Sequence, residues 1–202
     1  MPSDLGFSNE RYVLPELNIN KHIVKNESQI EVDGQFQMIN IVAKSFQAVR
    51  HEQKQTERER CEKAIELAQD KTSVYWCNTN NESAILKASD REAVEIIGSQ
   101  SIDKKEDILK SFANGDIKKL ITKPKMTAFG LNWQHCGHTT YFPTFSYEQY
   151  YQAIRRFWRY GRTEKVIADI VHTDGQKRII DSITAKMIKA NDLFDKLNSN
   201  LN

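Results

Sequence analysis

Glycine is scarce in this sequence, and the glycine-rich motifs that surround nucleotide phosphates are missing. Only eight of the 202 residues are glycine, and neither G-x-x-x-x-G-K-[ST] nor G-x-G-x-x-G occurs. Backbone amides cradle a phosphate where glycines let the chain approach it closely. No carboxylate pair of the Walker B kind follows a strand-like run either. We therefore expect no phosphate loop in this chain, and a contribution to any nucleotide site only through its cations.

Cysteine is also scarce, and long apolar runs are absent. The three cysteines, Cys61, Cys77 and Cys136, are odd in number and scattered, which favours reduced thiols over a disulfide framework. No run is long enough to span a bilayer. The first residues have neither the basic start nor the apolar stretch of a signal peptide. These features predict a cytoplasmic protein without a membrane partner.

A metal site is not expected. The stretch His135-Cys136-Gly137-His138 is the one that invites a zinc assignment. Zinc needs a fourth ligand, and the other candidate ligands are scattered. We interpret this stretch as a turn at the edge of a strand. A Cys/His nucleophile pair is equally unsupported, because no base or oxyanion arrangement is evident.

Charge of one sign does not dominate the chain. Twenty-nine Lys and Arg against 27 Asp and Glu leave a net charge of +2. There is thus no global attraction to polyanions, and a nucleic-acid surface would require local clusters of Lys and Arg.

The apolar pattern divides the chain into three parts. Residues 1–54 are expected to be a connector with short strands, including a hairpin of residues 22–24 with 36–42 and a turn at Asp33-Gly34. Residues 55–175 alternate helices and strands, and 176–202 form a C-terminal helix. In the middle part we expect helices at 56–68, 80–88, 102–112 and 147–159, with strands at 73–77, 94–97, 119–122, 139–142 and 166–172.

This alternation predicts the fold class. Strands separated by helices pair in parallel through right-handed crossovers. The strands are short and apolar throughout, as expected when helices cover both faces of a sheet. We therefore predict an α/β three-layer sandwich with a mostly parallel sheet of about five or six strands. Trp76 and Trp133 are expected in its core.

The segment Tyr147–Arg162 carries the most informative chemistry. On a helix, Gln152, Arg156 and Arg159 are spaced i, i+4 and i+7 and share one face. Guanidinium groups are permanently charged, and their planar forks suit phosphate oxygens. The alternative is a solvated basic face on a surface helix. Trp158, beside these arginines, is a candidate for a cation–π contact.

The order of residues in this segment resembles a known motif. Gln152-Ala153-Ile154-Arg155-Arg156-Phe157-Trp158-Arg159-Tyr160-Gly161-Arg162 is similar to motif VI of superfamily 2 helicases, in the Q-A-x-x-R-x-x-R-x-G-Q form of Swi/Snf-type ATPases. The resemblance implies catalytic arginine fingers at Arg156 and Arg159, with Gln152 and Arg162 at the nucleotide. Arg162 departs from the Swi/Snf form, which has Gln there. The resemblance to motif VI also implies that the sheet is RecA-like, of the P-loop NTPase type.

Two further segments agree with this resemblance. Residues 119–133 resemble motif V, which implies that Thr122 and Lys123 contact the nucleic-acid backbone and that Gly130 and Asn132 lie at the nucleotide. On its own, Gly130 would be interpreted as a simple turn. Residues 74–78 resemble motif IV and residues 98–101 the next block, which places Asn78 and Ser99 at nucleic acid. The alternative for the serines is ordinary helix capping.

The family resemblance implies a function. The chain is expected to be the second lobe of an ATP-dependent DNA helicase or translocase, similar to bacteriophage-type Swi/Snf-like enzymes and resident in the host cytoplasm. ATP and Mg²⁺ would be held by an N-terminal RecA-like lobe carrying Walker A and B. The lobe alone would lack ATPase activity, and its nucleic acid would be double-stranded DNA rather than RNA.

Two alternatives remain. One is a passive nucleic-acid-binding module whose basic patch consists of Lys118, Lys119, Lys123 and Lys125. The other is a different doubly wound enzyme, such as a small-molecule transferase. The absence of a glycine-rich first turn argues against the second alternative.

Overall fold

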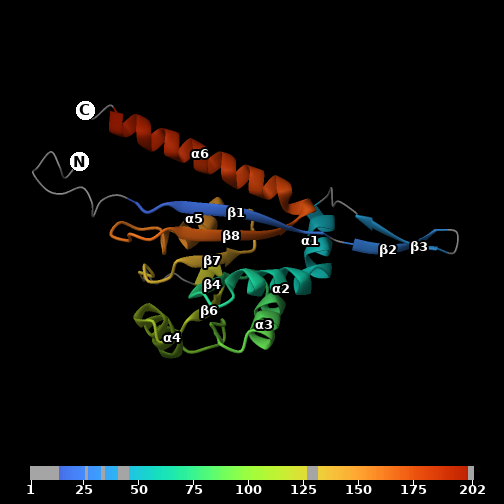
Figure 1. Ribbon diagram of the computed structural model, residues 1–202, viewed down its shortest axis with the longest axis horizontal. Helices are drawn as coiled ribbons and strands as arrows, with labels where there is room; N and C mark the ends of the chain where they lie inside the picture. The colour runs from blue at the N-terminus through green and yellow to red at the C-terminus, as the bar shows by residue number, and fades with distance from the viewer. Residues whose placement is uncertain (1–13, 26, 33–34, 41–45, 127–131, 200–202) are drawn as a thin grey trace, which may run out of the picture.

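The computed structural model contains a six-stranded parallel sheet with helices on both faces (Figure 1). It describes residues 14–25, 27–32, 35–40, 46–126 and 132–199. The strand order is β1-β8-β7-β4-β6-β5, and every pairing is parallel. The strands are β1 (Leu17–Val24), β4 (Ser73–Trp76), β5 (Ala93–Glu95), β6 (Lys119–Thr122), β7 (His138–Tyr141) and β8 (Val166–Thr173). The predicted α/β class is confirmed.

Alternating side chains of the strands form two hydrophobic cores, one on each face. On β4, Val74 and Trp76 pack with helices α4, α5 and α6, while Tyr75 packs with α2 and α3. This period of two lets a short strand bury both faces. Trp76 and Trp133 lie in the first core as expected, with ring centroids 5.8 Å apart. The helices are α2 (Glu57–Ala68), α3 (Asn80–Ser89), α4 (Ile102–Asn114), α5 (Tyr147–Arg155) and α6 (Lys177–Ser199).

Local side chains define where the helices begin and end. Thr79 and Glu82 form a capping box at the start of α3, and Ser101 caps α4, which ends at the left-handed Gly115 (φ 86°). Thr56 precedes α2 but makes no side-chain capping hydrogen bond to it. The Thr56 hydroxyl instead donates to the Glu52 carbonyl at 2.8 Å, because a further helix, α1 (Phe46–Gln55), precedes α2.

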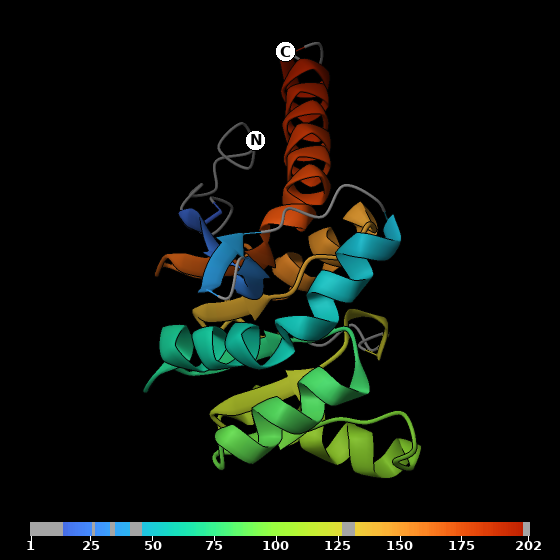
Figure 2. The same cartoon turned by 90° about the vertical axis from the view of Figure 1, so that its right-hand side faces the viewer.

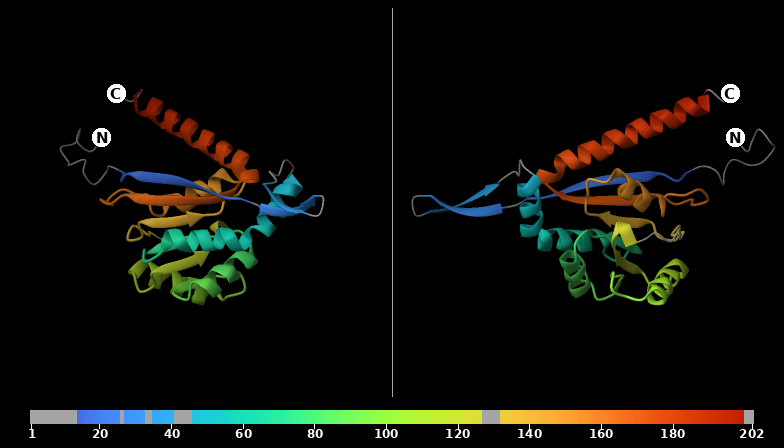
Figure 3. Two further views of the ribbon diagram at one scale, coloured as in Figure 1. Left: turned by 45° about the vertical axis from the view of Figure 1, so that its right-hand side comes forward. Right: turned by 180° about the vertical axis from the view of Figure 1, so that it is seen from behind.

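The segment before α1 contributes more than a connector. β1 pairs along its whole length with β8 and becomes an edge strand of the main sheet. The hairpin is formed by β2 (Glu27–Val32) and β3 (Gln35–Asn40), not by residues 22–24, which belong to β1. The predicted turn, Asp33-Gly34, lies outside the described residues. Figure 3 shows the hairpin projecting from the body at the end where α6 begins.

The prediction that the helix beginning at Tyr147 reaches Arg159 was wrong. α5 starts after its N-cap Ser146 and ends at Arg155. Residues 156–160 form an irregular turn, and Gly161 adopts φ 87° before the chain enters β8. A backbone with that φ favours glycine and cannot continue a right-handed helix. The arginines therefore do not all lie on one helical face.

Candidate functional site

Parallel pairing sorts the candidate residues onto two opposite edges of the sheet. All strands end at the same edge, the carboxyl edge, which Figure 2 faces. Asn78 follows β4, Ser99 lies shortly after β5, and Lys123 follows β6 at this edge. Asn132 precedes β7, and the turn 156–162 precedes β8, so both lie at the amino edge. The residues expected at nucleic acid and those expected at the nucleotide are thus about one strand length apart.

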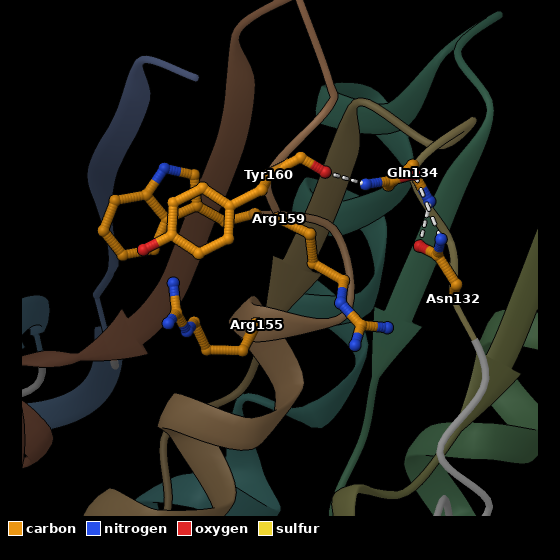
Figure 4. A pocket seen from close by; sticks show the side chains of 6 residues that line it. Asn132, Gln134, Arg155, Arg159 and Tyr160 are labelled. Carbon is orange, nitrogen blue, oxygen red and sulfur yellow. Dashed lines mark hydrogen bonds between the residues drawn. The ribbon is translucent and has the colours of Figure 1, made fainter. Parts of the chain in front are cut away.

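The amino edge carries a solvent-open hollow of about 660 Å³. It is lined by Asn132, Gln134, Arg155, Trp158, Arg159 and Tyr160. Figure 4 shows Arg159 extending across this hollow toward Asn132. Arg159 is exposed, so its guanidinium is available to an anion. Two predicted residues, Arg159 and Asn132, are therefore brought together here.

Arg156 and Gln152 do not line this hollow. The Arg156 guanidinium is half-buried and lies over the Trp133 ring, 5.2 Å from its centroid. Burial, and then the positive charge of Arg159, lower the pKa of Arg156, so the two cations are close enough to interact. Gln152 is exposed on α5, and its amide donates to Glu148 at 3.1 Å. Because α5 ends at Arg155, the i, i+4, i+7 arrangement predicted for these residues does not form.

Arg155 is a cation of the hollow that the sequence analysis missed. Its guanidinium stacks over Tyr151 and Trp158, at 5.5 and 5.2 Å from the two ring centroids. The cation–π contact expected of Trp158 is thus confirmed, with Arg155 as its partner. The signal was present as aromatic residues four positions before and three positions after Arg155, which are neighbours on a helix.

The arginine-bearing turn is held in place by the segment that precedes β7. The Gln134 side chain donates to the Tyr160 carbonyl, and the Trp133 amide donates to the Arg156 carbonyl at 3.1 Å. The Asn132 side chain in turn donates to Gln134 at 3.0 Å. These bonds link both ends of residues 156–160 to a single stretch of chain. The position of Arg159 therefore depends on Gln134 as well as on α5.

Arg162, expected at the nucleotide, is instead bonded within the protein. Its side chain is only 7% exposed and donates to the carbonyls of Gln134 and Glu164 and to the Glu164 carboxylate. It packs directly over Gly137. A guanidinium bound by three acceptors and turned away from the hollow holds the strand ends together, so the predicted contact with a nucleotide is not supported by this geometry.

At the carboxyl edge, the predicted nucleic-acid residues differ in how they are exposed. Thr122 is fully buried, so its side chain cannot reach a phosphate backbone, contrary to the prediction. Lys123 is half-buried and its ammonium donates to Asn80 at the start of α3. The side-chain amide of Asn78 donates to the Phe142 carbonyl at 3.1 Å. Ser99 is exposed, and Ser101, not Ser99, caps α4. Gly130 lies outside the described residues.

The basic patch of the passive-binding alternative does not form one surface. Lys119 is buried and ion-paired with Asp90 at 3.1 Å. Lys118 precedes β6 at the amino edge, whereas Lys123 and Lys125 follow β6 at the carboxyl edge. Residues adjacent in sequence are separated here by the length of the strand.

A polar network centred on the buried Asp169 crosses the sheet. Asp169 on β8 accepts hydrogen bonds from Asn20 (2.8 Å), His22 (2.9 Å) and His138 (2.8 Å), and Ser73 bonds the other nitrogen of His138. Burial by itself would raise the pKa of Asp169, but these hydrogen bonds outweigh it and lower that pKa. The network joins strands β1, β8, β7 and β4.

The His135-Cys136-Gly137-His138 stretch packs inside the protein. The His135 ring contacts Phe112 edge-on at 4.9 Å, and burial, followed by the charge of Arg162, lowers the pKa of His135. The Cys136 thiol lies within hydrogen-bond distance of two backbone carbonyls, those of Thr72 and His138. Within the described ranges, no group of three or more His, Cys, Asp or Glu side chains is arranged to hold a metal ion. Those ranges likewise contain no helix with the length and apolar character needed to cross a bilayer.

Comparison with known proteins assigns a family. Residues 45–161, more than half of the chain, match the helicase conserved C-terminal domain. The chain belongs to this family. The matched region of this helicase C-terminal lobe includes α1, the carboxyl-edge residues and the arginine-bearing turn. No curated protein sequence matches the chain.

Solved structures share the fold of the helicase C-terminal lobe. The C-terminal part of the Fun30 ATPase domain gives a TM-score of 0.52 at 17% identity, over 62% of this chain and 44% of that one. The C-terminal domain of the DEAD-box protein Dbp5 gives 0.52 at 17%, over 65% and 78%. A DEAD box protein from Methanococcus jannaschii gives 0.54 at 19%, over 65% and 37%. The RecA-like fold is confirmed, while the Swi/Snf-like and bacteriophage-type character stays a prediction.

A substitution at Gly137 tests whether the hydrogen bonds of Arg162 stabilise this helicase lobe. A Cβ at Gly137 would lie 2.6 Å from the Arg162 guanidinium, whereas one at Gly98 would meet nothing within 4 Å. We expect Gly137→Ala to displace Arg162 and lower the free energy of unfolding by about 1–2 kcal/mol. Gly98→Ala should change it by less than about 0.5 kcal/mol. Urea titrations give the free energy of unfolding of both variants. Equal values would contradict a stabilising role for the hydrogen bonds of Arg162.

Proposed function

We propose that this chain is the second RecA-like lobe of an ATP-dependent DNA helicase or translocase. ATP binds between it and an N-terminal lobe that carries Walker A and B and holds the phosphates and Mg²⁺. The observation that carries the proposal is the exposed Arg159 guanidinium in a hollow at the amino edge, within the family match and the motif VI resemblance. The absence of a phosphate loop from this chain agrees with a contributing role.

Arg159 is the residue to which we assign transition-state stabilisation. Phosphoryl transfer spreads negative charge over the transferring group, and a preorganised guanidinium stabilises that charge. The hollow is open to solvent in this chain, so the N-terminal lobe closing over it would exclude water and strengthen the interaction. Arg156, half-buried over Trp133 and close enough to Arg159 for their charges to interact, acts as the second charge of the pair. Asn132 and Gln134 line the same hollow as Arg159.

We assign nucleic-acid binding to the carboxyl edge, away from the arginines. Lys123, Asn78 and Ser99 follow three neighbouring strands there, and backbone contacts of this kind position a protein without reading sequence. Opening and closing of the lobes would then couple hydrolysis at one edge to movement of nucleic acid at the other. The preference for DNA comes from the Swi/Snf form of motif VI.

Reconstitution tests this function. The chain alone is expected to hydrolyse no ATP. Joined to an N-terminal lobe with Walker A and B, it should hydrolyse ATP at a rate that nucleic acid increases. Duplex DNA, single-stranded DNA and RNA are compared as activators, with DNA expected to activate most strongly. Nucleic acid that binds the chain but never stimulates hydrolysis by the joined protein would favour the passive-binding alternative.

A further inference from the structure

A second hollow, of about 590 Å³, lies at the carboxyl edge between α1 and the start of α3. It is lined by Arg50, His51, Gln53, Lys54, Glu57, Asn78, Thr79 and Glu82. Asn78 is shared with the edge where we place nucleic acid. In Figure 2, α1 (cyan) and α3 (green) both face the viewer on this edge.

One wall of this hollow is cationic. Arg50 and Lys54 are four residues apart on α1 and therefore project from the same side of that helix. Both are exposed, as is His51 between them. Long cationic side chains on a surface helix have the reach and the charge to contact successive phosphates.

The other wall is less acidic than its two carboxylates suggest. Glu82 is ion-paired with the buried Arg60 at 2.7 Å and also accepts hydrogen bonds from the backbone amides of Asn78 and Thr79. Its charge is therefore compensated inside the protein. Glu57 accepts hydrogen bonds from Thr79 and Asn81. Against it stand Arg50 and Lys54, with the Lys123 ammonium at Asn80 beside the hollow. Of the two lining carboxylates, Glu82 is thus compensated by Arg60, which leaves Glu57 opposite the cations of α1.

The lining also indicates which part of a nucleic acid would bind. None of the eight lining residues is aliphatic or a Phe, Tyr or Trp, so His51 is the one lining ring on which a base could stack. The other lining groups are charged or polar and suit phosphate and sugar. An isolated nucleotide would therefore make few base contacts here, whereas a phosphodiester chain would add contacts along the edge.

We propose that α1 forms an additional phosphodiester-binding wall, in which Arg50 and Lys54 contact the backbone of a nucleic acid lying across the carboxyl edge. This inference rests on the proposed function for its ligand, but it can be tested on this chain alone. It extends the nucleic-acid surface onto a helix that the sequence analysis had assigned to a connector. Contact through phosphates predicts binding with little dependence on base sequence.

The test is a fluorescence anisotropy titration of the 202-residue chain with a labelled DNA duplex of mixed sequence, a single strand and an RNA duplex, each at several salt concentrations. Arg50→Gln/Lys54→Gln is compared with Arg91→Gln/Lys71→Gln, which removes the same charge from exposed positions at the amino edge. We expect the α1 variant to bind about tenfold more weakly than the wild type. The slope of log K against log salt concentration should become shallower by about two, because two phosphate contacts are lost. The control pair should bind like the wild type.

Three results would overturn the inference: no binding of any nucleic acid by the wild type, unchanged binding by the α1 variant, or an equal loss in the control pair. Circular dichroism verifies that both variants are folded. The outcome is separable from the proposed function. A joined two-lobe protein without ATPase activity would contradict that function while leaving α1-dependent binding intact. A joined protein that hydrolyses ATP, and whose affinity for nucleic acid is unchanged in Arg50→Gln/Lys54→Gln, would contradict only the inference.

Discussion

Replacing Arg159 by alanine is expected to lower nucleic-acid-stimulated ATP hydrolysis by the joined two-lobe protein about a thousandfold, the size of effect that arginine fingers produce. The guanidinium is exposed in the amino-edge hollow and held there by a turn bonded to Gln134. Its charge acts on the transition state more than on bound ATP, so kcat should fall much more than the affinity for ATP. Stopped-flow or steady-state phosphate release measures both.

Variants at neighbouring positions make this prediction specific. Arg159→Lys keeps the charge but loses the planar fork, so it should restore only part of the rate. Arg91→Ala, an exposed arginine at the far end of the same sheet edge, should leave the rate unchanged. A joined protein in which Arg159→Ala hydrolyses ATP like the wild type would remove Arg159 from the catalytic role.

Replacing Asp169 by alanine is expected to destabilise the lobe by about 3–5 kcal/mol, because it leaves the buried His138 without its acceptor and removes two further hydrogen bonds, to Asn20 and His22. The carboxylate is buried, and Asn20, His22 and His138 all donate to it. His22 and Asn20 belong to β1, so the edge strand should separate first. Asp107→Ala, on the exposed side of α4, should change stability by less than about 0.5 kcal/mol. Urea titrations compare the two variants.

The same carboxylate predicts a pH dependence. Hydrogen bonding lowers the pKa of Asp169 in the folded protein below the ordinary aspartate value of about 3.9. The unfolded chain therefore binds this proton at higher pH than the folded chain does. The stabilisation is fully present above about pH 5 and is lost as the pH falls below about 4. The stability difference between wild type and Asp169→Ala should narrow between pH 6 and pH 3. A difference that stays constant over this range would contradict the assignment.

Much of the fold was predictable because it depends on local patterns. The short apolar strands and intervening helices indicated a parallel sheet, and Thr79, Ser101 and Gly115 mark helix ends by local hydrogen bonding and backbone geometry. The end of α5 was predicted four residues too late, since an amphipathic pattern continued past Arg155 while the backbone did not. The Trp133–Arg156 backbone bond, between distant segments, holds that turn.

The candidate site was predictable only in part, for a related reason. Residue type and order in the sequence drew attention to Arg159 and Asn132, and the structure places both on one hollow. The same reasoning assigned Arg162 to the nucleotide and Thr122 to nucleic acid, yet one is bonded within the protein and the other is buried. A motif states which residue types are present, whereas burial depends on what packs above them.

By itself, the sequence determined three things about this protein: an α/β chain, no phosphate loop, and a conspicuous run of arginines before the last strand. These follow from residue type and spacing, which act over a few positions along the chain. Only the tertiary structure decided which arginine faces solvent, that β1 completes the sheet, and that Arg50 and Lys54 share a hollow with Asn78. Those outcomes depend on contacts between segments far apart in sequence, where packing and hydrogen bonding choose among arrangements that local preference leaves equal.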